Sequence, residues 1–142
     1  MAATSAATDI GFLTQFGKMV ANVFTPFAEM TDFGPPGISR DSVDFTHFGS
    51  PDFFREFKPG IADGGEVSVT YNLVPGLLDD AAIGAHFDTR SVEAWRVVFP
   101  NGAKLDFRGF ATAHERATPM DDKMTGSATF KVTGKPVLTP AA

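Results

Sequence analysis

Residues 44–72 read DFTHFGSPDFFREFKPGIADGGEVSVTYN, and this stretch decides the fold. Its start belongs to a short strand expected over 41–48, and the charged, aromatic middle with its Pro-Gly and Gly-Gly turns predicts a long loop over 49–63. Residues 65–73 alternate apolar and polar side chains, as a half-buried strand does. A β-domain that presents a long ordered loop usually binds something with it. We expect the partner to be another copy of the same chain.

Alternation and turn residues predict the other strands. We expect one or two strands within 14–32, broken near Pro26, then strands at 92–99, at 104–111 (with an extension to Arg116 as an alternative) and at 125–133. Asn101-Gly102 favours a hairpin between the second and third of these segments, because both residues tolerate positive φ. Gly134-Lys135-Pro136 is expected to end the last strand.

The segment from Leu77 to Arg90 favours a helix, with Asp79 and Asp80 in the first turn, where the helix dipole favours negative charge. Several strands, one helix and three further strands predict a mainly β chain. Its expected architecture is an antiparallel β-sandwich or open barrel with one flanking α-helix.

The length of 142 residues suits one domain, which we place at 14–136. The Ala, Thr and Ser content of residues 1–13 predicts a flexible N-terminal arm, and residues 137–142 predict a flexible C-terminal tail. The longest apolar runs are far shorter than a membrane span, so we expect no membrane partner.

No catalytic, cofactor-binding or metal-binding pattern stands out. Cysteine is absent, which excludes disulfides and thiolate metal sites. His47, His86 and His114 stand far apart, and we interpret each as a surface or hydrogen-bonded structural residue. Asp79-Asp80 and Asp121-Asp122 are interpreted as helix-start charge and as a solvated loop. We therefore expect no enzyme activity, no metal and no cofactor.

Phenylalanine is unusually frequent, with 15 residues against one Trp and one Tyr. Several lie in segments expected to be loops, so some are predicted to be buried between subunits; the alternative is that they simply fill the core. The candidates for subunit contact are the aromatic and charged residues of the long loop: Phe53, Phe54, Arg55, Glu56, Phe57 and Asp63.

Charge is spread unevenly within the net charge of −5. Residues 1–93 carry 5 basic and 13 acidic side chains, whereas residues 94–142 carry 7 basic and 4 acidic ones. Opposite signs on different faces suit head-to-tail contacts between copies, although solvation of a small domain explains the same numbers. The overall acidity argues against tight nucleic-acid binding, which needs a basic surface.

An ordered set of short motifs over roughly residues 15–136 resembles a known family. The set comprises Asp44-Phe-Thr46, Ser50, Arg55-Glu56, Pro59-Gly60-Ile61, Asp63-Gly-Gly-Glu-Val-Ser68, Asn72, Trp95 to Gly102, Gly109-Phe-Ala-Thr112, Pro119-Met-Asp-Asp-Lys123 and Val132 to Pro136. It is similar to the tail tube (major tail) proteins of long, non-contractile phage tails, a family that includes the tubes of gene transfer agents and prophage-derived particles.

The resemblance implies a structural virion protein whose copies form hexameric rings around a continuous inner β-barrel. Stacked rings would form a hollow tube through which DNA passes without specific binding. The implied partners are other copies of the chain and the tape measure, tail tip and tail terminator proteins, with assembly in the host bacterial cytoplasm.

Two other functions stay open at this point. Tubes of contractile systems, such as type VI secretion, share the implied fold, and adjacent sheath and spike genes would favour that alternative. A β-sandwich module that binds carbohydrate or a receptor is the other, but one Trp and one Tyr make a poor platform for stacking sugars.

Overall fold

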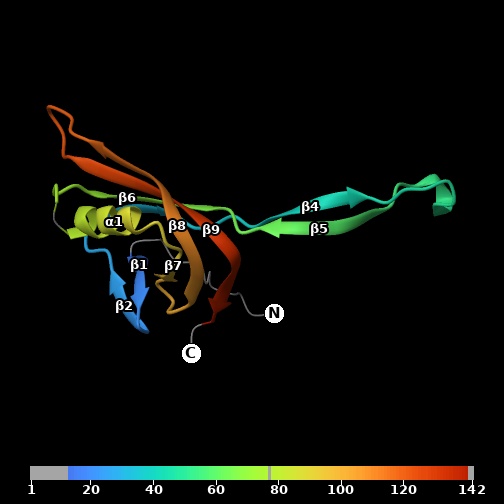
Figure 1. The fold of residues 1–142 in the computed structure, drawn as a ribbon, viewed down its shortest axis with the longest axis horizontal. Helices are drawn as coiled ribbons and strands as arrows, with labels where there is room; N and C mark the ends of the chain where they lie inside the picture. The colour runs from blue at the N-terminus through green and yellow to red at the C-terminus, as the bar shows by residue number, and fades with distance from the viewer. Residues whose placement is uncertain (1–12, 77, 141–142) are drawn as a thin grey trace, which may run out of the picture.

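The computed structural model describes residues 13–76 and 78–140, which form a seven-stranded antiparallel sheet, one α-helix and a separate two-stranded hairpin (Figure 1). The strand order in the sheet is β2-β1-β7-β8-β9-β6-β3. The bounds are β1 Gln15–Val20, β2 Val23–Pro26, β3 Met30–Gly34, β6 Glu66–Asn72, β7 Glu93–Val98, β8 Lys104–Ala117 and β9 Thr125–Thr139, with helix α1 at Leu78–Thr89. The hairpin consists of β4 Ser39–Asp44 and β5 Phe57–Asp63.

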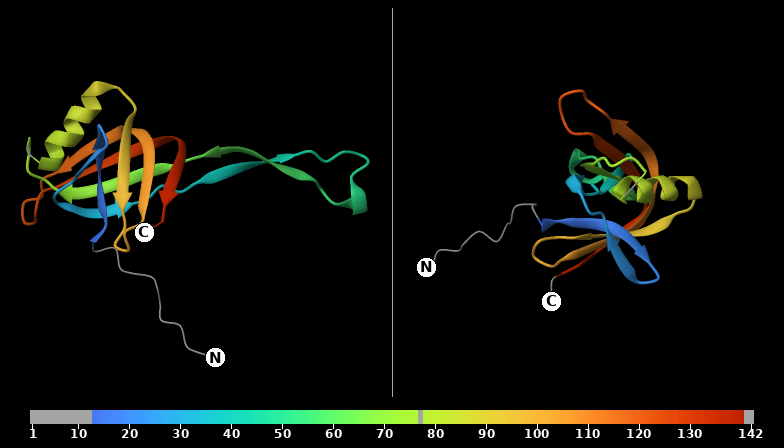
Figure 2. Two further views of the ribbon diagram at one scale, coloured as in Figure 1. Left: turned by 90° about the horizontal axis from the view of Figure 1, so that it is seen from below. Right: turned by 90° about the vertical axis from the view of Figure 1, so that its left-hand side faces the viewer.

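The sheet curls over on itself (Figure 2). Phe16 on β1 and Phe33 on β3 come from near opposite ends of the strand order, yet their ring centroids are 5.0 Å apart. Two shifts of register between β8 and β9, after Asp106 and after Ala111, add local twist to the longest strands. The predicted open barrel with one flanking helix is therefore confirmed.

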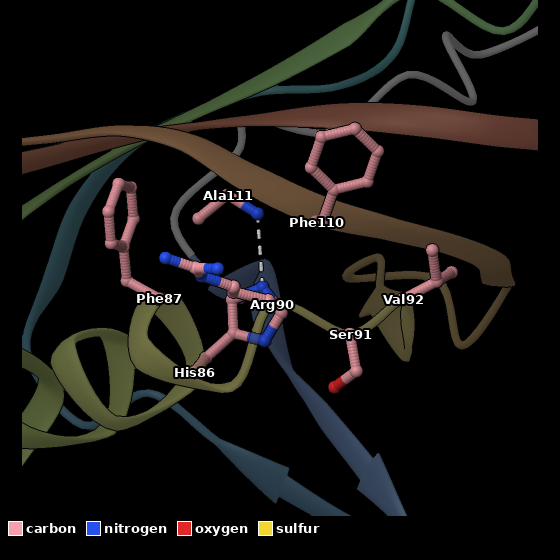
Figure 3. A pocket seen from close by; sticks show the side chains of 7 residues that line it. All are labelled: His86, Phe87, Arg90, Ser91, Val92, Phe110 and Ala111. Carbon is pink, nitrogen blue, oxygen red and sulfur yellow. Dashed lines mark hydrogen bonds between the residues drawn. The ribbon is translucent and has the colours of Figure 1, made fainter.

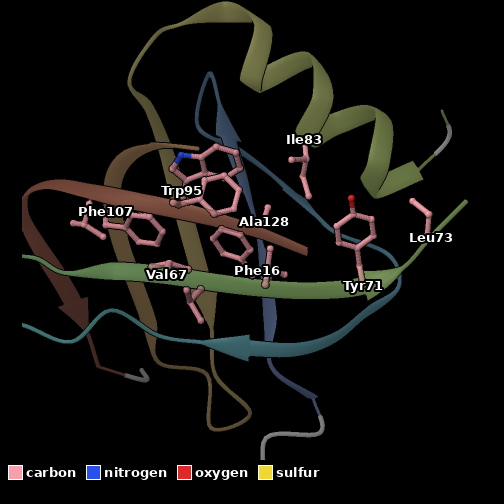
Figure 4. Packing of buried hydrophobic residues seen from close by; sticks show 12 residues of the cluster. Phe16, Val67, Tyr71, Leu73, Ile83, Trp95, Phe107 and Ala128 are labelled. Carbon is pink, nitrogen blue, oxygen red and sulfur yellow. The ribbon is translucent and has the colours of Figure 1, made fainter. Parts of the chain in front are cut away.

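An aromatic cluster fills the concave side of the sheet (Figure 4). Trp95 lies between Phe16 and Phe130, with centroid distances of 5.6 and 4.7 Å, and all three side chains are buried. Aromatic pairs of this kind contribute about 0.5–1.5 kcal/mol each beyond the burial of their area. The body is thus held together from within, and it does not need the projecting β4–β5 hairpin for its core.

Helix α1 is tied to the sheet by its two buried first-turn carboxylates. Asp79 accepts hydrogen bonds from the backbone N–H groups of Ala28 and Glu29, at 2.8 and 3.0 Å. Asp80 accepts from Arg116 on β8 at 2.8 and 3.2 Å and from the Tyr71 hydroxyl on β6 at 3.2 Å. These acids do more than complement the helix dipole, because they join the helix to both halves of the chain.

The helix, the strand at 65–73, and the hairpin around Asn101-Gly102 are confirmed as α1, β6 and the β7–β8 turn, apart from Leu77, which lies outside the described residues. The segment 14–32 contains more strands than the one or two predicted: β1, β2 and the start of β3. The break lies at Ala21 and Asn22, both at positive φ, in addition to the one after Pro26. Asn favours this conformation but Ala does not, so the sequence carries only half of the usual turn signal.

The last strand is also longer than predicted. Strand β9 continues through Gly134 and Pro136 to Thr139, and its end pairs with the start of β8. It therefore takes in residues 137–139, which the sequence assigned to a flexible tail. Residues 141–142, and the N-terminal arm except for Leu13, lie outside the described residues, so the flexibility of both ends stays a prediction.

Replacing Asp80 by Asn should destabilise the fold in a pH-dependent way. The Arg116 guanidinium lowers the pKa of Asp80 to about 2, from an ordinary value of 3.8. Because the folded-state pKa lies below the unfolded one, the ionised carboxylate stabilises the protein above about pH 4, and this contribution is lost as the pH falls toward 2. Arg116 is half exposed and stays hydrated when its partner is removed.

We therefore expect Asp80→Asn to lower the free energy of unfolding by about 1.5–3 kcal/mol at pH 7, the range for hydrogen bonds to charged groups. The difference from wild type should shrink toward pH 2, as measured by urea unfolding across this range. Asp88→Asn, on the exposed side of the same helix, is the matched control and should change little. An Asp80→Asn penalty independent of pH would contradict the assignment.

Candidate assembly interface

Strands β4 and β5 form a two-stranded sheet of their own, which extends from the body along the longest axis of the molecule (Figure 1). We call residues 39–63 the projecting hairpin. The predicted loop at 49–63 is partly wrong, because residues 57–63 pair with β4 and the connection is confined to 45–56. Pro59, interpreted as part of a turn, lies within β5 opposite Ser42. A hairpin with two free edges tolerates the missing N–H of proline.

The projecting hairpin exposes apolar side chains on both of its faces. All six residues of β4 are exposed. The exposed large apolar side chains in and next to the hairpin are Ile38, Val43, Phe45, Phe48, Phe53, Phe54, Phe57 and Ile61. An isolated two-stranded hairpin is only marginally stable in water, and exposed apolar patches mark interaction sites. The hairpin therefore has the properties of a contact element that is covered by another molecule.

A hydrogen-bond network orders the tip of the hairpin. The Ser50 hydroxyl donates to Glu56 at 2.7 Å and accepts from the His47 backbone N–H at 3.0 Å. Thr46 accepts the Glu56 N–H at 2.8 Å, and the Phe45 N–H donates to the Glu56 carbonyl at 2.8 Å. The Ser50 hydroxyl also lies 3.0 Å from His47 Nδ1, so three side chains of the tip share one hydrogen-bonded group.

Two consecutive residues at the tip have strained backbones. Asp52 and Phe53 have φ values of 57° and 61°, in the left-handed region that bulky residues rarely occupy. Such conformations cost about 1–3 kcal/mol each and cluster at functional sites. Their effect is to hold the Phe53 ring fully exposed at the end of the hairpin.

The structure brings five of the six predicted contact residues together. Phe53, Phe54 and Arg55 are exposed at the tip, Phe57 begins β5, and the side chain of Glu56 belongs to the network described above. Asp63 lies at the other end of the hairpin, where it accepts from Lys131 Nζ and from the Gly65 N–H, both at 2.8 Å. The Lys131 ammonium lowers the pKa of Asp63, and this residue ties the base of the hairpin to β9.

Several strand edges of the main sheet lack a strand neighbour in the described part of the chain, among them β2 and β3 at the two ends of the strand order. Strand β3 ends the strand order and pairs with β6 alone. Strand β7 covers β8 only from Lys104 to Gly109, so residues 110–117 of β8 pair with β9 alone. Unpaired edges of this kind readily accept another strand. The sequence predicted the strands but contained no signal for where their pairing stops.

A cavity of about 420 Å³ lies between the C-terminal end of α1 and strand β8 (Figure 3). Its lining residues are His86, Phe87, Arg90, Ser91, Val92, Phe110 and Ala111. His86 is buried, accepts the Ala111 N–H at 3.0 Å and lies 2.9 Å from Glu93 through its other ring nitrogen. The sequence did not indicate this cavity, because its walls come from segments about 20 residues apart.

Reactive groups are not concentrated at any of these surfaces. Within residues 13–76 and 78–140, no three His, Asp or Glu side chains gather where they could hold a metal ion. Over the same residues, α1 is the longest helix, and it is too short and too polar to cross a membrane.

The family model described as lambda phage tail tube protein, TTP, matches residues 11–139. A search of curated protein sequences found no match. Among solved structures, the tail of an empty gene transfer agent particle, refined with C6 symmetry, has a TM-score of 0.74 at 16% identity and covers 95% of this chain and 100% of its own.

Two further solved structures represent other kinds of tube. The SPP1 tail tube has a TM-score of 0.66 at 15% identity, covering 88% of this chain and 74% of that one. The sheath–tube complex of an extracellular contractile injection system has a TM-score of 0.71 at 9% identity, covering 96% and 99%. At these identities the structural likeness shows the fold.

Replacing Glu56 by Ala should loosen the hairpin tip without affecting the body. Ser50 loses a hydrogen bond to a charged group, a loss of about 1.5–3 kcal/mol. We expect amide hydrogen exchange at residues 45–56 to accelerate by about tenfold or more, while exchange in β6 and β9 stays unchanged. Arg55→Ala, a truncation of the exposed neighbouring side chain, is the control. Equal exchange rates in the two variants would show that the network does not order the tip.

Proposed function

The chain belongs to the lambda phage tail tube protein family, and on this premise we propose that it assembles into stacked hexameric rings that form the hollow tail tube for DNA delivery. The observation that carries the proposal is a self-sufficient body that leaves an apolar projecting hairpin and several sheet edges uncovered, among them β3 and part of β8. Each of these features requires another protein surface, and copies of the same chain supply surfaces that repeat without limit in a tube.

Ring closure is assigned to the two free edges, with β3 of one copy beside the free part of β8 in the next. Strands β3, β6, β9 and β8 are antiparallel to one another in that order. Four alternating strands per copy place β8 antiparallel to the next copy's β3 when all copies point the same way. The pairing pattern therefore continues around a ring and covers the β3 and β8 edges, as barrel closure does.

The number of copies in the ring is proposed from a relative. A gene transfer agent tail with the same fold was refined with C6 symmetry. Six copies contributing four strands each would enclose a wide inner barrel, and barrel diameter grows roughly linearly with strand number. A head-to-tail ring closes only at one rotation per copy, which fits a fixed seam between two different edges.

The convex face of the β3-β6-β9-β8 segment is assigned to the lumen. Its cross-strand rows carry Ser68 beside Thr129, and Thr70 beside Ser127. The charged groups on this face include Asp32, Glu66 and Glu115 with the cations Arg108 and Lys131, and Lys131 is paired with Asp63. A wall of small hydroxyls with surplus carboxylates repels phosphates within a Debye length of about 8 Å, so DNA can slide along it without binding.

The projecting hairpin is assigned to contact between rings, with Phe53, Phe54, Arg55 and Phe57 as contact residues.

We also infer that the chain has no catalytic role and that it is assembled in the host bacterial cytoplasm. Its other partners are tape measure, tail tip and tail terminator proteins, which it meets along and at the ends of the tube. A tube subunit of a contractile system is the second candidate, favoured by the likeness to a contractile sheath–tube complex. Sheath and spike genes beside this one would support it.

Electron microscopy of the purified, concentrated chain, and of tails recovered from particles, tests the proposal. We expect hollow filaments of stacked rings with six subunits per ring. Tails that lack this chain would overturn the proposal. Filaments with closed, separate molecules and no continuous inner barrel would overturn the assignment of the edges.

Replacing Arg55 by Glu should block tube formation while leaving the subunit folded. The change reverses a fully exposed charge on the hairpin tip, and a like charge facing the partner opposes association. We expect the critical concentration for assembly to rise by about tenfold or more, with unchanged Trp95 fluorescence. Arg55→Lys keeps the charge and is the matched control. Tubes of normal length from the Glu variant would show that Arg55 is outside the interface.

A double replacement, Ser127→Lys with Thr129→Lys, tests the lumen assignment. Both positions lie on the convex face of β9, so the tube should gain a basic inner wall and retain linear duplex DNA. Because lysine–phosphate contacts release counterions, retention should decrease steeply with salt. The control places two lysines on exposed positions of α1, Ala85→Lys with Asp88→Lys. Equal retention by both variants in a sedimentation assay would contradict the assignment.

A further inference from the structure

The cavity between α1 and β8 is preformed and apolar. Phe87, Val92 and Phe110 line it and are exposed to solvent, although they belong to the body rather than to the hairpin. Its floor is fixed, since both ring nitrogens of the buried His86 are engaged, with the Ala111 N–H and with Glu93. A rigid apolar pocket of about 420 Å³ is within the size range of ligand sites and can accept an aromatic side chain.

Arg90 stands at the rim of this cavity in an unusual conformation. It follows the last residue of α1 and has a φ of 55°, at the position where helices usually place glycine. No hydrogen bond or ion pair involving its side chain occurs among the described residues. Figure 3 shows the side chain extending toward Phe87. The position therefore holds a free cation where glycine would fit the backbone better.

The hairpin tip carries the complementary groups in the same arrangement. Phe53 is fully exposed, and Asp52 precedes it with a carboxylate that makes no hydrogen bond or ion pair in the described chain. Both residues have positive φ. An exposed ring next to a free carboxylate at the tip thus matches an apolar pocket next to a free guanidinium on the body.

The occupant of the cavity must come from a second copy. The projecting hairpin extends away from its own body (Figures 1 and 2), so a tip cannot reach the cavity of the same molecule. Tip and cavity are different surfaces, and contact between them is heterologous and propagates from copy to copy. The cavity includes Phe110 and Ala111, which border the β8 edge assigned to ring closure. A tip seated there would also hold that seam.

We propose that the cavity beside the end of α1 receives the hairpin tip of a copy in the neighbouring ring, with the Phe53 ring inserted between Phe87, Val92 and Phe110 and with Asp52 paired to Arg90. The inference rests on the proposed tube function and specifies how one ring recognises the next. Each copy contributes one tip and offers one cavity, so every ring-to-ring contact has the same composition.

Cysteine cross-linking tests the contact directly, because the natural chain has no cysteine. We expect tubes of Phe53→Cys with Val92→Cys to form disulfide-linked oligomers under mild oxidation, seen as a ladder on a non-reducing gel. The control combines Phe53→Cys with Met120→Cys, a more exposed position on the body than Val92, and should not form the ladder.

A charge exchange gives an independent measurement. Arg90→Asp and Asp52→Arg should each raise the critical concentration for tube formation by about tenfold or more, and the double variant should recover most of the loss. Trp95 fluorescence verifies that each subunit is folded. The cross-linking result does not depend on these charges and tests the contact even where a charge variant fails to fold.

The possible results distinguish a failure of the docking contact from a failure of the tube function. Intact tubes without the Phe53–Val92 ladder, or a double charge variant no better than the single ones, would overturn the docking contact and leave the tube function standing. A ladder in the Met120 control instead would place the hairpin tip beside the loop between β8 and β9 rather than in the cavity, and would also overturn the contact. A wild-type chain absent from rings and tubes would overturn the docking contact together with the tube function.

Discussion

The contact between Phe16 and Phe33 determines how much of this sheet can be satisfied within one molecule. It draws the two ends of a seven-stranded sheet together around an aromatic core, so the body is stable alone. It does not close the barrel, because the terminal strands β2 and β3 do not pair with each other, and the second half of β8 also has a free edge. Curling without closing is the physical basis of the proposed assembly, since unpaired backbone groups of a strand edge readily accept another strand.

The projecting hairpin, unlike the body, is not stabilised by a hydrophobic core. Its strands have no core beneath them, and its apolar residues face solvent on both sides. Order comes instead from local polar contacts, in which Glu56 organises Thr46 and Ser50, and from the Asp63–Lys131 pair at the base. Such a segment can be specific in shape before assembly while contributing little to the stability of the subunit. Ordering it in advance reduces the entropy lost on binding.

Local signals in the sequence were sufficient for the elements that have their own start and stop residues. The α1 helix, the turn at Asn101-Gly102 and the alternating strand β6 were predicted closely for this reason. The turn at Ala21-Asn22 and strand β5 were not, because Ala lacks turn preference and β5 has no buried face to produce alternation. The tip residues Phe53 to Phe57 stood out as aromatic residues in a predicted loop. The cavity did not, because only folding brings residues 86–92 beside Phe110.

Strain at both the tip and the cavity rim has a consequence for the direction of assembly. Glycine would adopt the backbone conformations of Asp52, Phe53 and Arg90 at a lower free energy. The side chains at these positions therefore have to make contacts that offset this strain. Within the subunit these side chains are exposed, so the backbone strain is not offset there. Because the two strained sites lie on different parts of one chain, the proposed contacts that offset the strain involve one copy ahead and one copy behind. A tube built this way has polarity from its first contact, and only its two ends retain unfilled sites, where proteins of other kinds can bind.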